Sequence, residues 1–337
     1  MQQLEATETT GVILLNLGGP ESLDEVEPFL YNLFSDRRII RLGPAFLQKT
    51  IARLIARRRA PKSRENYRKI GGGSPINRIT ADQAKSLEQR LRPAGRFMVR
   101  ACMRYHPPLA RQVLRQMTAA GVRRIIGLPL YPHYSIATTG SSFSDLHRAA
   151  GVIEPAPAIV EIRSWPREPL YINCLARRVR EGLARFSGPV QVVYSAHSLP
   201  KKFIAEGDPY VRELETTIQA LEEKTGQPGR LCYQSRSGPV EWLEPSTPDM
   251  LHRLADQGCE NILMVPISFV SDHVETLYEI DMLYRDMAHE MGMRLESTRA
   301  LNDDPEFIAA LHDLVLNAAS PPSTGSVPPN NKIEITK

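Results

Sequence analysis

The sequence lacks the features that would place the protein in several large classes. No apolar run approaches the roughly 18 residues that a membrane-spanning helix needs, and residues 1–10 lack the basic and apolar regions of a secretory signal peptide. Cys102, Cys174, Cys232 and Cys259 show no zinc or iron–sulfur spacing. The net charge of only +4 does not by itself indicate a nucleic-acid partner. We therefore expect a cytoplasmic protein whose reduced thiols mostly fill the core.

Apolar runs alternate with helical patterns along the 337 residues. The runs predicted as buried strands are 12–17, 97–103, 125–130, 190–196, 230–235 and 261–268. Strands that alternate with helices of ten or more residues are typical of parallel sheets built from βαβ crossovers. The chain length suits about two domains of ~100–200 residues. The pattern therefore predicts an α/β protein with two doubly wound domains.

The predicted domain boundary lies near Trp165-Pro166. It separates an N-terminal domain, residues 11–165, from a C-terminal domain, residues 166–304. A last helix, residues 305–318, is expected to return to the first domain. The two ends, residues 1–10 and 320–337, are expected to be disordered, the second because of its Pro, Ser, Asn and Gly content.

Two capping-box patterns and one glycine run predict local structure. Ser22-x-x-Glu25 and Thr80-x-x-Gln83 each predict the start of a helix. The segment 71–75, Gly-Gly-Gly-Ser-Pro, lacks the ending of a phosphate-binding loop, and no clear strand precedes it. We interpret it as a tight turn.

Two predicted strands end at titratable residues. His197 ends one of them, and the run 261–268 leads into a second cluster that contains His273. Ligands bind just outside the carboxyl ends of the strands in open α/β sheets. A histidine at such a place can accept a proton at neutral pH. The more common role of a histidine at a strand end is structural, with its ring held by hydrogen bonds.

An acidic row follows His273. Asp272, Glu275 and Glu279 are spaced i, i+3 and i+7, so they are expected on one face of a helix. Partly shielded carboxylates have raised pKa values and can exchange protons or attract a divalent cation. The alternative is that the row has no chemical function and is simply the solvent-exposed face of a helix.

A basic amphipathic stretch precedes the glycine turn. Apolar and basic residues alternate there at helical spacing: Phe46, Leu47, Lys49, Ile51, Arg53, Leu54, Ile55, Arg57, Arg58, Arg59 and Lys62. Such a helix can lie on a membrane surface or cover an apolar ligand, while an ordinary surface helix is the alternative. Two more strand ends carry Arg104-Tyr105 and Tyr131. Together these groups suit a flat apolar molecule with acidic tails and a metal ion beside it.

The chain resembles the ferrochelatase family over about residues 11–316. The matching segments, in family order, are 15–21, 67–76, 131–142, 195–200, 207–210 and 271–279. The resemblance implies two Rossmann-like domains with a porphyrin site between them. It also implies a lyase-class chelatase that inserts Fe²⁺ into protoporphyrin IX, the terminal step of haem biosynthesis, with release of two protons.

The resemblance also implies roles for individual residues. His197 would accept the pyrrole protons, Glu275 would be its acidic partner across the macrocycle, and either could hold the metal. Asp272, His273 and Glu279 would support an acidic path. The porphyrin site would be lined by Leu17, Arg59, Lys62, Tyr67, Ser74, Arg104, Tyr105, Tyr131, Trp242 and Phe269.

Three departures from the family pattern carry further expectations. Residues 320–337 contain no cysteine and an internal cysteine position is Ile136, so no [2Fe–2S] cluster and no other permanent cofactor are expected. Leu283 stands where the acidic row often continues. The basic stretch 42–59 favours protoporphyrin over coproporphyrin and implies peripheral contact with the inner face of a membrane. The protein would be a monomer or a homodimer.

Two other functions stay open at this point. A chelatase of the same fold could insert cobalt into sirohydrochlorin, although its many-carboxylate substrate would suit a more basic, less aromatic site. A non-catalytic porphyrin or haem carrier would be free to lose His197 and Glu275, which are both present.

Overall fold

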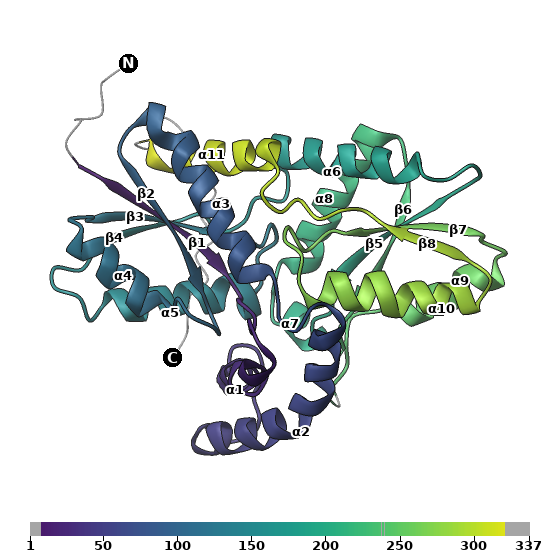
Figure 1. Ribbon diagram of the computed structural model, residues 1–337, viewed down its shortest axis with the longest axis horizontal. Helices are drawn as coiled ribbons and strands as arrows, with labels where there is room; N and C mark the ends of the chain where they lie inside the picture. The colour runs from purple at the N-terminus through teal and green to yellow at the C-terminus, as the bar shows by residue number, and fades with distance from the viewer. Residues whose placement is uncertain (1–7, 237, 239, 321–337) are drawn as a thin grey trace.

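The computed structural model describes residues 8–236, 238 and 240–320. It contains two four-stranded parallel sheets with helices on their faces (Figure 1). The predicted α/β class with two doubly wound parallel sheets is thereby confirmed. The predictions for residues 1–7 and 321–337 lie outside the described residues, whereas Thr10, which was predicted to be disordered, begins the first strand because it pairs with the neighbouring strands.

The first sheet has the order β2-β1-β3-β4. Its strands are β1 (Thr10–Asn16), β2 (Phe97–Met103), β3 (Arg124–Pro129) and β4 (Ala158–Glu161). The inner strand β1 is buried from Gly11 to Asn16, and only its first residue, Thr10, is partly exposed. Continuous apolar runs of this kind are typical of strands covered on both faces.

The second sheet repeats this order as β6-β5-β7-β8. Its strands are β5 (Gln191–His197), β6 (Gly229–Gln234), β7 (Asn261–Pro266) and β8 (Arg294–Ser297). His197 and Gln234 are register partners at the carboxyl ends of β5 and β6. This edge of the second sheet therefore collects the polar residues that follow its strands.

Helices cover both sheets and form a separate projection (Figure 1). In the first half they are η1 (Leu23–Glu25), α1 (Val26–Ser35), η2 (Ala45–Leu47), α2 (Gln48–Lys69), α3 (Ile76–Leu91), η3 (Arg92–Ala94), α4 (Ala110–Ala119), η4 (Ile136–Gly140) and α5 (Ser141–Ala150). In the second half they are α6 (Pro169–Leu183), α7 (Lys201–Ala205), α8 (Tyr210–Thr225), α9 (Thr247–Asp256), η5 (Glu275–Tyr284), α10 (Arg285–Glu290) and α11 (Pro305–Ala319).

The last helix joins the two halves. In Figure 1, α11 lies along α3 of the first half and α6 of the second, and both contacts are made. Arg124 at the start of β3 donates to the carbonyl oxygens of Ala318 and Ala319, at 3.2 and 2.9 Å. One hydrophobic cluster includes Val12 of β1 and Val192 of β5, so the two sheets share a core.

Helices α1 and α2 form the projection seen below the two sheets in Figure 1. Their mutual packing buries Ala52, Ala56 and Ala60 of α2, small residues that allow close approach. The amphipathic stretch is helical, as predicted, but α2 continues through Pro61 to Lys69. In the part of the chain that the structure describes, no helix combines the length and apolarity needed to cross a membrane.

Several local predictions are wrong for identifiable reasons. Thr80 and Gln83 do not open a helix, because α3 begins four residues earlier and the Thr80 hydroxyl donates to the Ile76 carbonyl. A helix does start after Ser22, as predicted, since Ser22 is the N-cap residue of η1, but its side chain makes no capping hydrogen bond. The carboxylate of Glu25 accepts the backbone N–H of Glu21 at 2.8 Å. The edge strands β4 and β8 are only four residues long and were not predicted.

Candidate active site at the end of the second sheet

His197 is held rigidly at the carboxyl end of β5. Its backbone N–H donates to the Ser268 hydroxyl, which follows β7, at 3.1 Å. Its carbonyl oxygen accepts the hydroxyl of Tyr210, the first residue of α8, at 3.1 Å. The side chain stays 39% exposed. The fold thus fixes the backbone and leaves the imidazole accessible.

The imidazole pairs directly with Glu275. His197 Nδ1 lies 2.8 Å from Glu275 Oε2, and the Glu275 side chain is 20% exposed. The expectation that the two groups face each other across a macrocycle is therefore wrong, since no ring fits between atoms in hydrogen-bond contact. They lie on one side because β5 and the start of η5 converge at the same sheet edge.

The acidic row is carried by a π-helix. The sequence predicted an ordinary helical face, but η5 has π geometry over Glu275–Tyr284, with backbone bonds from i to i+5. Glu275 and Glu279 both reach Ser235, whereas Asp272 precedes the helix. π-turns inserted into helices are frequent at functional sites.

Ser235 and Gln234 were missed by the sequence analysis. The Ser235 hydroxyl lies 3.0 Å from Glu275 Oε2 and 2.6 Å from Glu279 Oε2. The Gln234 amide donates to the Glu275 carbonyl oxygen and to Glu279 Oε2, at 3.1 and 3.3 Å. These residues end the predicted strand 230–235, so its position as a third strand end beside His197 was the available signal.

Burial and mutual charge separate the pKa values of the cluster. Burial alone would lower the pKa of His197, but the carboxylate of Glu275 outweighs it and raises that pKa. Burial opposes ionisation of Glu275 as well, yet His197 and His273 lower its pKa to about 2. Burial and the charge of Glu275 raise the pKa of Glu279 to about 7. The His197–Glu275 pair thus lies beside Glu279, a carboxyl group whose pKa is raised to near neutrality.

His273 lies at the edge of this cluster. Its Nε2 is 3.9 Å from Glu275 Oε1, and its Nδ1 lies 3.1 Å from the Ser271 carbonyl oxygen. The ring packs on Phe269 with centroids 4.5 Å apart. Burial lowers the pKa of His273, so the neutral ring is favoured.

Comparison with known proteins identifies the family. A family model described as Ferrochelatase matches residues 9–319. The chain belongs to the ferrochelatase family. A ferrochelatase of Desulfotalea psychrophila is 56% identical over 311 residues, covering 92% of this chain and 97% of the relative. A ferrochelatase of Geotalea uraniireducens is 48% identical, covering 93% and 99%.

The similar solved structures show the fold alone, because their sequence identity to this chain is low. SirB from Bacillus subtilis with Fe³⁺ aligns with a TM-score of 0.54 at 11% identity, covering 93% of this chain and 96% of that one. A sirohydrochlorin chelatase SirB of Bacillus subtilis subspecies spizizenii in complex with cobalt gives a TM-score of 0.53 at 11% identity, covering 92% and 95%.

The positions that the ferrochelatase resemblance assigns to the porphyrin differ in accessibility. Tyr105 is 2% exposed, and its hydroxyl donates to Asp36 at 2.9 Å. Arg104 donates to the same carboxylate at 2.7 Å and to the Ser141 hydroxyl at 2.8 Å. Tyr131 is also buried. These three side chains are tied into the first domain, whereas Leu17, Trp242 and Phe269 stay partly exposed.

The remaining assigned positions lie on α2 and in the turn after it. Arg59 and Lys62 are exposed on α2, and Arg59 lies over the Phe34 ring at 5.5 Å. Tyr67 is buried, and burial together with the charge of Glu275 raises its pKa. Ser74 is buried in the predicted glycine turn. The end of α2 therefore adjoins the ion pair.

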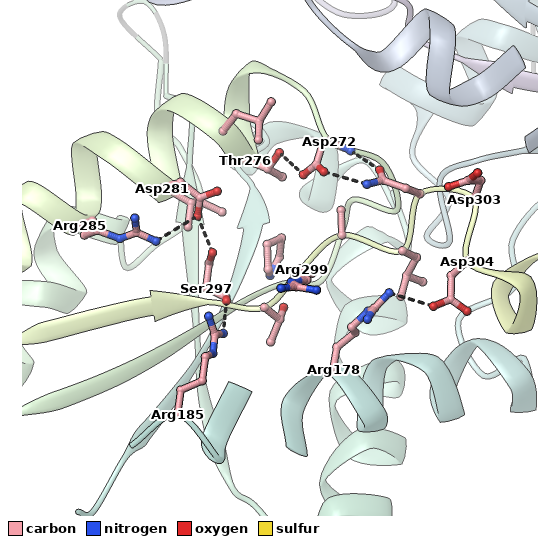
Figure 2. A pocket seen from close by; sticks show the side chains of 17 residues that line it. Arg178, Arg185, Asp272, Thr276, Asp281, Arg285, Ser297, Arg299, Asp303 and Asp304 are labelled. Atoms are coloured by element: carbon pink, nitrogen blue, oxygen red, sulfur yellow. Dashed lines mark hydrogen bonds and ion pairs between the residues drawn. The ribbon is translucent and has the colours of Figure 1, made fainter. Parts of the chain in front are cut away.

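A charged cavity of about 460 Å³ lies near the start of η5 (Figure 2). Asp272 and Thr276 line it, together with Ser297 at the end of β8 and residues of the β8–α11 connection such as Arg299 and Asn302. None of His197, Glu275 and Glu279 lines this cavity. Asp272 therefore faces a different space from the ion pair, and the structure does not bring it to the other acidic residues.

A second group of potential metal ligands is already neutralised. Among the described residues, Cys174, Asp304 and Glu306 present ligand atoms within 4.8 Å of one another. Arg177 bonds to both carboxylates, at 2.6 and 3.2 Å. Burial and nearby acids raise the pKa of Cys174 to about 12, so the thiolate that a metal requires is disfavoured.

Proposed function

We propose that this ferrochelatase inserts Fe²⁺ into protoporphyrin IX with release of two protons, and that His197 and Glu275 form its catalytic pair. The observation that supports these roles is the 2.8 Å contact between His197 Nδ1 and Glu275 Oε2 beside an accessible imidazole. Iron is a substrate of this reaction, and we propose no resident cofactor.

The contact dictates which nitrogen acts as the base. The carboxylate of Glu275 accepts the proton on Nδ1, so the lone pair of neutral His197 resides on Nε2. Within the described residues, Nε2 makes no hydrogen bond. A pyrrole N–H within about 3 Å of Nε2 could lose its proton there. The resulting imidazolium is stabilised by Glu275, as in other imidazole–carboxylate pairs.

The protein must act on both substrates, by distorting the porphyrin ring and by binding the Fe²⁺ ion. A planar porphyrin hides its nitrogen lone pairs from an incoming ion, so binding must distort the ring. The free energy for this distortion comes from contacts between the protein and parts of the porphyrin remote from the nitrogens. Fe²⁺ accepts mixed imidazole and carboxylate ligands, which makes His197 and Glu275 its proposed ligands. Glu279 and His273 would support proton transfer beside them.

The proposed porphyrin site includes the positions assigned by resemblance. Leu17, Trp242 and Phe269 would contact the ring, and Arg59 and Lys62 would meet its carboxylates. The buried Tyr67, Ser74, Tyr105 and Tyr131 are proposed to form the supporting walls, together with the half-buried Arg104.

We further propose peripheral contact with the inner face of a membrane. Phe46 and Leu54 are 81% and 69% exposed on the α1–α2 projection, next to arginines such as Arg53 and Arg57. Apolar side chains beside basic ones suit the boundary of an anionic bilayer. An apolar porphyrin partitions into lipid, so this contact would bring the enzyme to its substrate.

A substrate panel tests the function. Wild-type protein is expected to metallate protoporphyrin IX with Fe²⁺ faster than coproporphyrin III, as measured by the change in porphyrin absorbance. Activity only with sirohydrochlorin and Co²⁺ would instead establish the alternative chelatase. Tight porphyrin binding without metallation would establish a carrier.

Variants of the pair test the proposed roles. His197→Ala is expected to abolish turnover, and Glu275→Ala to lower kcat by about 100-fold or more, because the base or its stabilising charge is lost. His252→Ala, which removes an exposed imidazole on α9, is the matched control. Full activity of His197→Ala would remove that residue from the mechanism.

A further inference from the structure

Asp272 is fully occupied by neighbours that do not belong to the catalytic cluster. Its backbone N–H donates to Asn302 Oδ1 at 2.9 Å, and its Oδ2 accepts from Asn302 Nδ2 at 2.8 Å. Its Oδ1 accepts the Thr276 hydroxyl at 3.2 Å. Figure 2 shows these bonds beside the charged cavity. Both carboxylate oxygens are therefore committed to holding the residues that flank the start of η5.

Asn302 is itself fixed by the surrounding fold. It has a φ of 46°, the left-handed region that Asn and Asp tolerate better than most residues. Its backbone N–H donates to the Val270 carbonyl oxygen at 2.8 Å. Its carbonyl oxygen accepts the amide of Gln83 at 2.6 Å. The connection between β8 and α11 thus contacts the loop before η5 through both backbone and side chain.

Gln83 extends these contacts to the first domain. It is fully buried on α3, and its Nε2 also donates to the Ser271 hydroxyl at 3.1 Å. Residues 270–272 are consequently bonded to Asn302 on one side and to α3 on the other. Glu275, three residues after Asp272, begins the π-helix at the end of this anchored loop.

We propose that Asp272 and Asn302 form a positioning pair that fixes the start of η5, and with it the carboxylate of Glu275, against His197. Asp272 is then a structural acceptor and not a member of the acidic path. This inference rests on the proposed catalytic role of Glu275. Its physical basis is the geometry of catalysis, because a displacement of a catalytic group by about 1 Å can lower the rate by roughly 100-fold.

Exchanging the two side chains distinguishes positioning from proton or metal transfer. Asn302→Asp alone sets two carboxylates against each other, and Asp272→Asn alone leaves two amides competing for fewer acceptors. The double variant, Asp272→Asn with Asn302→Asp, restores a complementary pair: the carboxylate at 302 accepts both the backbone N–H of residue 272 and its new amide. Thr276 still finds an amide oxygen.

The expected result is rescue. Asn302→Asp should lower kcat for iron insertion by about 10-fold or more with little change in KM for protoporphyrin, and the double variant should recover to within about 3-fold of wild type. Hydrogen exchange of residues 270–277 should accelerate in the single variants and return in the double. Asp303→Asn, a neighbouring exposed carboxylate, is the matched control and should resemble wild type.

Three outcomes would overturn the positioning role. One is a double variant as inactive as Asp272→Asn, which would mean that the carboxylate is needed at 272 itself. Another is wild-type kcat in both single variants. The third is hydrogen exchange unchanged by either substitution. Hydrogen exchange reports on the pair even without turnover, so an inactive wild-type protein would refute the proposed function separately.

Discussion

Individual side chains in the proposed catalytic cluster owe their pKa values to their neighbours. Glu275 and Glu279 are chemically identical and four residues apart, yet one pKa is lowered to about 2 and the other raised to about 7. The difference arises because Glu275 contacts His197 directly, while Glu279 meets a hydroxyl, an amide and the charge of Glu275. Pairs of acids with separated pKa values are typical of sites that move protons.

The raised pKa of Glu279 predicts a pH dependence of stability. Its folded pKa of about 7 exceeds the ordinary value of 4.5, so the folded state binds this proton more tightly. Its contribution to stability is fully present below about pH 4.5 and is lost as pH rises to about 7. The Glu279→Gln side chain cannot ionise. The thermal stability of this variant relative to wild type should therefore be higher at pH 8 than at pH 5.

The gain has an upper limit of roughly 3 kcal/mol, since each pKa unit corresponds to about 1.4 kcal/mol. Melting temperatures of both proteins at pH 5 and pH 8 measure it, with the exposed Glu260→Gln as control. An equal difference between variant and wild type at the two pH values would show that Glu279 titrates normally.

At the scale of elements, two helices depart from what their sequence patterns predict. Glu275 and Glu279 lie on a π-helix and share Ser235, whereas Asp272, the first residue of the acidic row, precedes this helix. The amphipathic stretch forms α2, which packs on α1 through small residues and leaves Phe46 and Leu54 outside. In both helices, a neighbouring element covers one face. Which face it covers decides which side chains stay exposed or come into contact.

The exposed apolar residues of the projection predict vesicle binding. The double variant Phe46→Ser with Leu54→Ser should bind anionic phospholipid vesicles several-fold more weakly than wild type, because most of the accessible apolar surface there is lost. Co-sedimentation measures the difference, and iron insertion with detergent-solubilised porphyrin should be retained.

A matched control separates a specific surface from general hydrophobicity. Val152 is 64% exposed and lies in the turn after α5, so Val152→Ser removes an apolar side chain elsewhere. If that variant weakened vesicle binding as much as the change at positions 46 and 54, the membrane proposal for the projection would fail.

At the scale of the whole molecule, the two sheets are joined by a common core and by α11. Phe307 of α11 is fully buried and lies 6.1 Å from the Trp165 ring, near the predicted domain boundary. It belongs to the cluster that contains residues of both β1 and β5. The relative placement of the two halves, and hence of the α1–α2 projection over η5, rests on this packing.

Truncation of Phe307 should destabilise both halves together. Phe307→Ala is expected to cost about 3–5 kcal/mol, the usual range for a buried phenylalanine, and to lower the melting temperature while retaining one cooperative transition. Differential scanning calorimetry measures both quantities, with Leu109→Ala, at a position 40% exposed, as control. Separate transitions for the two halves would contradict a shared core.

The sequence by itself determined the class of fold and the residues at the strand ends. Buried parallel strands are continuous apolar runs, so six strands are visible in the sequence: β1, β2, β3, β5, β6 and β7. His197 is the last residue of β5. The edge strands β4 and β8 are short and partly exposed, and such strands carry little periodic signal. The helix start at Ile76 was misplaced because a buried mid-helix Thr80 mimics a cap.

Only the tertiary structure decided which of these residues act together. Hydrophobic periodicity records which face of an element is buried, but not the distance between the ends of two elements. It therefore could not show that His197 and Glu275 touch on one side, that Ser235 joins the two glutamates, or that Asp272 turns away toward Asn302. Those contacts depend on where η5 and the β8–α11 connection lie relative to the strand ends, which is set by packing between segments distant in the sequence.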